Sequence, residues 1–140
     1  MADFELDERL ASDSIELGMV NGCKLLLMND RRWPWLVLVP MVAGAVEWHD
    51  LEPETASRCL DAAMELGKAL KQATGCEKIN MAAIGNIVRQ LHIHVVARSP
   101  GDPNWPAPVW GFGAREPYAD GEHGALEQAL LSRLSPERQW

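Results

Sequence analysis

Short apolar runs separated by turn residues predict five β-strands in this chain. The runs are rich in Val, Ile and Leu, which favour strands. They lie at residues 14–20, 23–28, 35–39, 78–84 and 90–97. Asn21-Gly22 between the first two runs is a strong signal for a tight hairpin, and Pro34 and Pro40 bound the third run. Because the first three runs follow one another through short connections, the pattern predicts an antiparallel meander.

A helical pattern separates the third run from the fourth. Apolar residues recur there every three or four positions, which predicts one main amphipathic helix over residues 53–73. The apolar stripe consists of Ala56, Cys59, Leu60, Ala63, Gly67 and Leu70. Pro53 suits the first turn of this helix and Gly75 suits its end. Shorter helices are expected at residues 7–11 and 125–134. The order of strands, helix and strands predicts an α+β fold, with one five-stranded antiparallel meander sheet.

Length and charge limit the classes of protein to consider. The chain has 140 residues, which fits a single domain over residues 1–140, with a core at about 14–98 and a Pro- and Trp-rich tail at 99–140. The formal net charge is −7, which argues against a nucleic-acid partner. No apolar run approaches the ~20 residues of a membrane helix. The first residues lack the basic and apolar regions of a secretory signal. Three cysteines without a CxxC pair suggest reduced thiols, and we expect a cytoplasmic protein.

The segment from Gln90 to Arg98 carries the strongest candidate chemistry. Alternate residues of a strand point to the same face, so His92 and His94 are expected to project together, with Gln90 beside them. The intervening residues would face the core: Leu91, Ile93 and Val95. Two imidazoles held on a rigid element form a candidate reactive face.

Three interpretations of the two histidines remain open on the residues alone. They could be structural side chains of the core. They could bind zinc, but such a site needs further ligands, and His49, His123 and the cysteines lie in no ligand motif, so no metal site is predicted. Alternatively, one imidazole could attack phosphorus through an unprotonated nitrogen while its other nitrogen donates to a backbone carbonyl. Backbone N–H groups at Gly85-Asn86 could then contact the same phosphate.

The pattern Gln90-x-His92-x-His94-x-x-x-Arg98 resembles the signature of the histidine triad (HIT) superfamily of nucleotide hydrolases and transferases. Aligned on the arginine, His92 matches the nucleophilic middle histidine and His94 the third, while Gln90 replaces the first. The apolar run that ends at Pro40 also resembles the family, and the segment 105–111 is similar to a bacterial subgroup called diadenosine polyphosphate hydrolase-like.

The resemblance implies an α+β protein that forms homodimers, with the two sheets joined into one. It implies that His92 attacks the α-phosphorus of a nucleotide, such as a dinucleoside polyphosphate or a nucleoside phosphoramidate, and that water then hydrolyses the nucleotidyl-histidine. His94 and Gln90 would bind phosphate oxygens or assist the leaving group. No cofactor is required, although Mg²⁺ could accompany a polyphosphate substrate.

The same resemblance suggests which side chains would bind the nucleotide. Asn29 or Asp30 would hold the ribose, and Asn80 and Asn86 would contact phosphate. The full set of candidate substrate-binding residues is Asn29, Asp30, Asn80, Gly85, Asn86, Arg98 and Trp105. Because Gln90 replaces a histidine, a nucleotide-binding or interaction module with weak turnover is the alternative function. Metal-dependent chemistry through the two histidines is a third.

Overall fold

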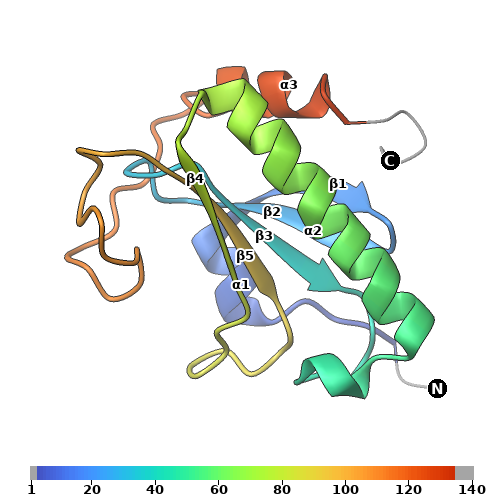
Figure 1. The fold of residues 1–140 in the computed structure, drawn as a ribbon. Coiled ribbons are helices and arrows are strands. Elements are labelled where there is room, and N and C mark those ends of the chain that lie inside the picture. Colours follow the sequence, from blue (N-terminus) through green and yellow to red (C-terminus); the bar gives the residue numbers. More distant parts are fainter. Residues whose placement is uncertain (1–2, 135–140) are drawn as a thin grey trace.

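A five-stranded antiparallel sheet with helices on both faces forms the framework of the protein (Figure 1). The structure is a computed structural model that describes residues 3–134. In chain order its elements are α1 (Glu8–Asp13), β1 (Ser14–Val20), β2 (Cys23–Met28), β3 (Trp35–Pro40), the 3₁₀ helix η1 (Trp48–Asp50), α2 (Pro53–Thr74), β4 (Lys78–Ala82), β5 (Ile93–Arg98) and α3 (Gly124–Leu131). The α+β class and the antiparallel five-stranded sheet are confirmed.

The strand order β1-β2-β3-β5-β4 departs from a simple meander after the third strand. The chain leaves β3, crosses one face as α2 and enters the sheet at its edge as β4, so β5 returns between β3 and β4. Burial explains why β5 is internal: every residue of β5 is buried, whereas β4 is largely exposed or half-buried. The meander prediction is therefore correct for β1 to β3 and wrong for the last two strands.

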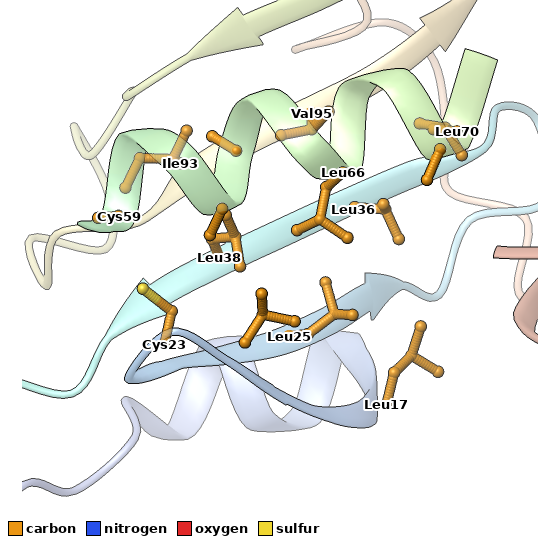
Figure 2. Packing of buried hydrophobic residues seen from close by; sticks show 14 of the residues in the cluster. Leu17, Cys23, Leu25, Leu36, Leu38, Cys59, Leu66, Leu70, Ile93 and Val95 are labelled. Atoms are coloured by element: carbon orange, nitrogen blue, oxygen red, sulfur yellow. The ribbon is translucent and has the colours of Figure 1, made fainter. Parts of the chain in front are cut away.

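Side chains of the strands divide between two hydrophobic clusters, one on each face of the sheet. Alternation along β5 sends Ile93 and Val95 into the larger cluster, which lies under α2 (Figure 2). Val96 belongs to the smaller cluster on the opposite face, with Trp33 and Trp35. The short helix α1 also packs against this second face, through the buried Leu10.

The ends of the elements agree with the sequence pattern wherever a turn residue marks them. Asn21 and Gly22 both have positive φ, as a type I′ hairpin requires. Gly75 ends α2 in the left-handed conformation, with φ of 70°. The strands predicted over 78–84 and 90–97 are shorter at their loop ends, and the helix predicted over 125–134 ends at Leu131. Among residues 3–134, none of the helices is long and apolar enough to cross a membrane.

The late start of β5 has a local cause. The ladder with β3 ends at the pair Leu38 and Ile93. In the same register Leu91 would lie opposite Pro40, which has no N–H to donate. The N–H of Leu91 instead donates to the carbonyl of Ala45 at 3.0 Å. The backbone before Ile93 therefore leaves the sheet.

Leu66 of α2 provides a test of this packing. Its side chain is fully buried under the helix, so Leu66→Ala should lower the free energy of unfolding by about 3 kcal/mol through lost burial and the cavity left behind. Lys68→Ala, at an exposed position of the same helix, should change it by less than ~0.5 kcal/mol. Urea unfolding followed by circular dichroism measures both; equal effects would contradict the packing described.

Candidate functional site

His92 and His94 lie together on the face of the sheet opposite α2. His94 is in β5 opposite Val37 of β3, and His92 lies just before the strand. Their rings are 4.9 Å apart between centroids and nearly perpendicular, and each residue is only 5% exposed. The residues between and beside them, Leu91, Ile93 and Val95, belong to the core on the other face. The shared face predicted from the alternation is confirmed.

A hydrogen bond to the backbone sets the tautomer of His92. Its Nδ1 lies 2.6 Å from the carbonyl oxygen of Gln90. A carbonyl oxygen can only accept, so Nδ1 carries the proton of this bond, and in the neutral ring Nε2 keeps a lone pair. This is the arrangement expected of an imidazole that attacks an electrophile through Nε2.

His94 is held in the opposite tautomer and kept neutral. The indole Nε1–H of Trp35 donates to His94 Nδ1 at 2.9 Å, and because an indole N–H only donates, this nitrogen must be unprotonated. Burial and the neighbouring His92 lower the pKa of His94 to about 4, although a hydrogen bond with the backbone of Ile84 opposes that shift. At neutral pH the ring therefore carries no charge, and it links β3 to the loop between β4 and β5.

Two cavities meet at His92. The larger, of about 510 Å³, is bordered by both histidines, by the rings of Trp35 and Trp110, and by residues of α1. The smaller, of about 310 Å³, lies towards Arg89 and Gln90. Both are within the size range of small-molecule sites. Asn86 and His92 line both, so a group bound at their junction would lie against the imidazole of His92.

The loop between β4 and β5 carries two more of the predicted residues to this junction. Gly85 borders the smaller cavity and Asn86 borders both. A Cβ at position 85 would lie 2.8 Å from the carbonyl oxygen of Val88, closer than side chains tolerate. Gly85 is therefore required by the tight path of this loop, and the loop in turn presents Asn86 to the cavities.

Asn29 and Asp30 are close in sequence to the end of β2, but other protein groups form hydrogen bonds with their side-chain oxygens. The Asn29 side-chain oxygen accepts from the N–H of Tyr118 at 2.9 Å. Asp30 is almost fully buried, and its two oxygens accept from Nε and Nη2 of Arg32. Burial alone would raise the pKa of Asp30, but the hydrogen bonds from Arg32 and from the backbone of Glu116 outweigh it and hold the pKa below its usual value. Their role in ribose binding stays a prediction.

Arg98, Asn80 and Trp105 gather at the other end of β5. The buried Arg98 forms a bidentate ion pair with Asp102 through Nε and Nη2, at 2.8 and 2.9 Å. Its Nη1 donates to the side-chain oxygen of Asn80, and its guanidinium lies 5.7 Å from the centroid of a Trp105 ring. The structure does not bring these three predicted residues to the histidines. Their contacts anchor the start of the tail to the sheet, and substrate binding by them stays a prediction.

Sequence reasoning missed Trp35 and the N-terminal part of the site. Trp35 orients His94, and Trp110 lies 5.2 Å from it between ring centroids. Trp110 Nε1 is buried and has no hydrogen-bond partner among the described residues. Its place in a proline-rich tail gave no periodic signal. Within residues 3–134, no three His, Cys, Asp or Glu side chains gather in a way that would hold a metal ion.

Comparisons with known proteins agree with this geometry. The model of the HIT domain matches residues 10–101. A histidine triad protein from Sinorhizobium meliloti 1021 has 50% identity and a TM-score of 0.92, covering 94% of this chain and 97% of its own. One from Marinobacter aquaeolei VT8 has 41% identity, a TM-score of 0.92 and coverages of 95% and 97%. One from Bradyrhizobium japonicum has 36% identity, a TM-score of 0.91 and coverages of 99% and 100%.

None of the curated proteins matches the chain. The family match nevertheless spans more than half of its length, and the solved relatives cover almost all of it. The chain belongs to the histidine triad (HIT) domain family.

Proposed function

We propose that this protein is a nucleotide hydrolase that cleaves a nucleoside 5′-phosphoryl bond through a nucleotidyl-histidine intermediate. HIT-domain proteins are generally nucleotide-binding hydrolases or transferases. The observation that carries the proposal is the 2.6 Å hydrogen bond from His92 Nδ1 to the Gln90 carbonyl, which leaves Nε2 with its lone pair beside two cavities.

The reaction would proceed in two displacements at the α-phosphorus. In the first, the lone pair of His92 Nε2 forms an N–P bond as the bond to the leaving group breaks. The leaving group departs with the electron pair, as a phosphate oxyanion or as an amine that takes up a proton. In the second, water attacks phosphorus, the N–P bond breaks, and the electron pair returns to Nε2, releasing a nucleoside monophosphate and a proton. The Gln90 carbonyl stabilises the positive charge that the ring carries between the two steps.

His94 would assist by remaining neutral next to that charge. A second cation 4.9 Å away would oppose the formation of the charged intermediate on His92, and the low pKa of His94 prevents this. Its Nδ1 accepts from Trp35, and the ring also forms a hydrogen bond with the backbone of Ile84. His94 would therefore hold the loop that carries Gly85 and Asn86, and direct contact between His94 and a phosphate stays a prediction.

The cavities suggest where the two parts of a substrate would bind. The phosphate would lie at the junction, against His92 and Asn86. Aromatic rings suit a nucleobase, so the larger cavity, with Trp35 and Trp110, would take the nucleoside. The leaving group would extend into the smaller cavity. Dinucleoside polyphosphates and nucleoside phosphoramidates both have this two-part form, and Mg²⁺ would accompany the former.

A nucleotide-binding module with little turnover is the second candidate. The observation in its favour is that the side chain of Gln90, at the first position of the motif, bonds to the backbone of Glu5 and Asp7 and contacts neither histidine in any interaction described. The homodimer with a continuous sheet and the cytoplasmic location are further proposals, which rest on the resemblance and on the composition.

His92→Ala tests the mechanism. Without the nucleophile, turnover of diadenosine tetraphosphate and of an adenosine phosphoramidate should fall by about 10⁴-fold or more, and no covalent adduct should form. Rapid quenching and mass spectrometry of the wild-type protein should detect an adenylyl group on His92. His49→Ala, which removes an exposed histidine, should have no effect on either measurement. Nucleotide binding by the wild-type protein without adduct or product would favour the binding module.

The buried neutral His94 should make stability depend on pH. Its pKa is about 4 in the folded protein, against an ordinary value of 6.5, so the unfolded chain binds more protons between these values. The free energy of unfolding should therefore decrease as pH falls from 6.5 to 4, by up to about 3 kcal/mol from this group.

Trp35→Phe identifies the source of that dependence. Loss of the indole donor removes a hydrogen bond that only the neutral ring can accept, so the pKa of His94 should rise. The free energy of unfolding should then decrease less between pH 6.5 and 4. Urea unfolding at several pH values, with NMR titration of His94, measures this. His49→Gln serves as the control, and an unchanged pH dependence in Trp35→Phe would disprove the role of the indole.

A further inference from the structure

The side chain of Gln90 pairs with the backbone of the N-terminal segment. Its Nε2 donates to the carbonyl of Glu5 at 2.8 Å, and its Oε1 accepts from the N–H of Asp7 at 2.9 Å. The opposite polarity of these partners determines the orientation of the amide. A side-chain amide carries a donor and an acceptor side by side, as a peptide group does. Gln90 thus extends the hydrogen bonding of the site to a segment more than 80 residues away in sequence.

The segment held by this pairing leads directly into α1. Phe4 and Leu6 pack against the hydrophobic cluster on the histidine face, which leaves the backbone of Glu5 and Asp7 for Gln90. Asp7 is also the N-cap of α1, where its carboxylate accepts from the N–H of Arg9 at 2.8 Å. A helix of six residues is not stable alone, so its position depends on such anchors at its start and on β1 at its end.

The helix α1 lies on the face of the sheet opposite α2 (Figure 1). It forms one wall of the larger cavity. Arg9, Leu10 and Asp13 line that cavity together with His92 and His94. The Asp13 carboxylate is paired with Arg115 at 2.9 Å, whereas the structure gives the exposed Arg9 no ion pair with residues 3–134. Its guanidinium is therefore a cation on this wall that can contact a phosphate or a nucleobase.

We propose that Gln90 is a positioning residue: its side chain clamps residues 5–7 so that α1 closes the wall of the histidine cavity and presents Arg9 to the bound nucleotide. The choice of a nucleotide as ligand rests on the proposed function, but the clamp itself does not. The two parts of Gln90 thus have different tasks. The backbone carbonyl orients His92, and the side-chain amide builds the binding wall.

This division of tasks predicts a separation of binding from chemistry. Gln90→Leu keeps the carbonyl and removes both clamp bonds, so the dissociation constant for 5′-AMP and the KM should rise by about tenfold, while kcat stays within about twofold. Gln90→Glu retains only the acceptor for Asp7 and should have a smaller effect. Gln90→His, which restores the family motif, should loosen the segment as the leucine variant does.

Three measurements on the full chain test the proposal. Hydrogen exchange at the amides of residues 5–13 should accelerate in Gln90→Leu, and calorimetry with 5′-AMP should give the loss of affinity. Arg9→Ala should also weaken AMP binding, and the double variant should bind little worse than either single variant, because both changes disable the same wall. Gln72→Leu, an exposed glutamine of α2, is the matched control and should change none of these values.

The results that would overturn the clamp differ from those that would overturn the proposed function. Unchanged exchange at residues 5–13 would show that Gln90 does not hold the segment. A fall in kcat at unchanged AMP affinity would make Gln90 a catalytic residue. If the loss of AMP affinity in the double variant equals the product of the two single losses, Gln90 and Arg9 act independently, which would contradict the clamp. Wild-type protein that binds AMP but turns over no substrate would overturn the proposed hydrolysis. Hydrogen exchange at residues 5–13 and the affinity for AMP would still test the clamp in that case.

Discussion

The hydrogen bond between His92 Nδ1 and the Gln90 carbonyl is the interaction on which the site depends, and it exists because the sheet ends where it does. The pairing of β5 stops at Ile93 on the β3 side and at His94 on the β4 side, so the backbone of residues 90–92 lies outside both ladders. The carbonyl of Gln90 is then available to accept from an imidazole. The end of strand pairing before β5 thus leaves the carbonyl acceptor that determines the tautomer of His92.

The neutral state of His94 is likewise a consequence of packing. Two imidazoles in contact on a water-exposed surface would both titrate near neutral pH. Here the indole of Trp35, which lies on the neighbouring strand, donates to His94. Burial of His94 among aromatic rings disfavours its charged form. His94 thereby connects β3, β5 and the loop that follows β4. The proposed mechanism assigns the change of charge to the other histidine, His92.

Local patterns predicted the parts of this structure that depend on near neighbours in the sequence. Alternation along β5 identified the shared face of His92 and His94, and the main helix with its glycine stop was clear from spacing. The insertion of β5 beside β3 was not predictable, because it depends on the path of the chain across the sheet. The same holds for Trp35 opposite His94, which requires the register between two strands.

The partners of two predicted ligand-binding residues, Asp30 and Arg98, were not predictable for a related reason. The resemblance to the family predicts Asp30 and Arg98 as ligand contacts, but each has a protein partner within four residues, Arg32 and Asp102. Whether such neighbours meet depends on the turn between them, and residues 99–118 have no periodic pattern that would specify one. The Gln90 clamp joins parts of the chain that no short-range pattern relates.

The aromatic side of the larger cavity has an evolutionary consequence. The match to the family ends at residue 101, yet Trp110 and Gly111 line the cavity, held in place by a tail whose first turn is tied to Arg98. The two histidines and the part of the cavity wall formed by Trp110 therefore lie in separate stretches of the sequence. If the larger cavity takes the base, as proposed, a change in the tail would alter base preference while the histidine strand stays the same.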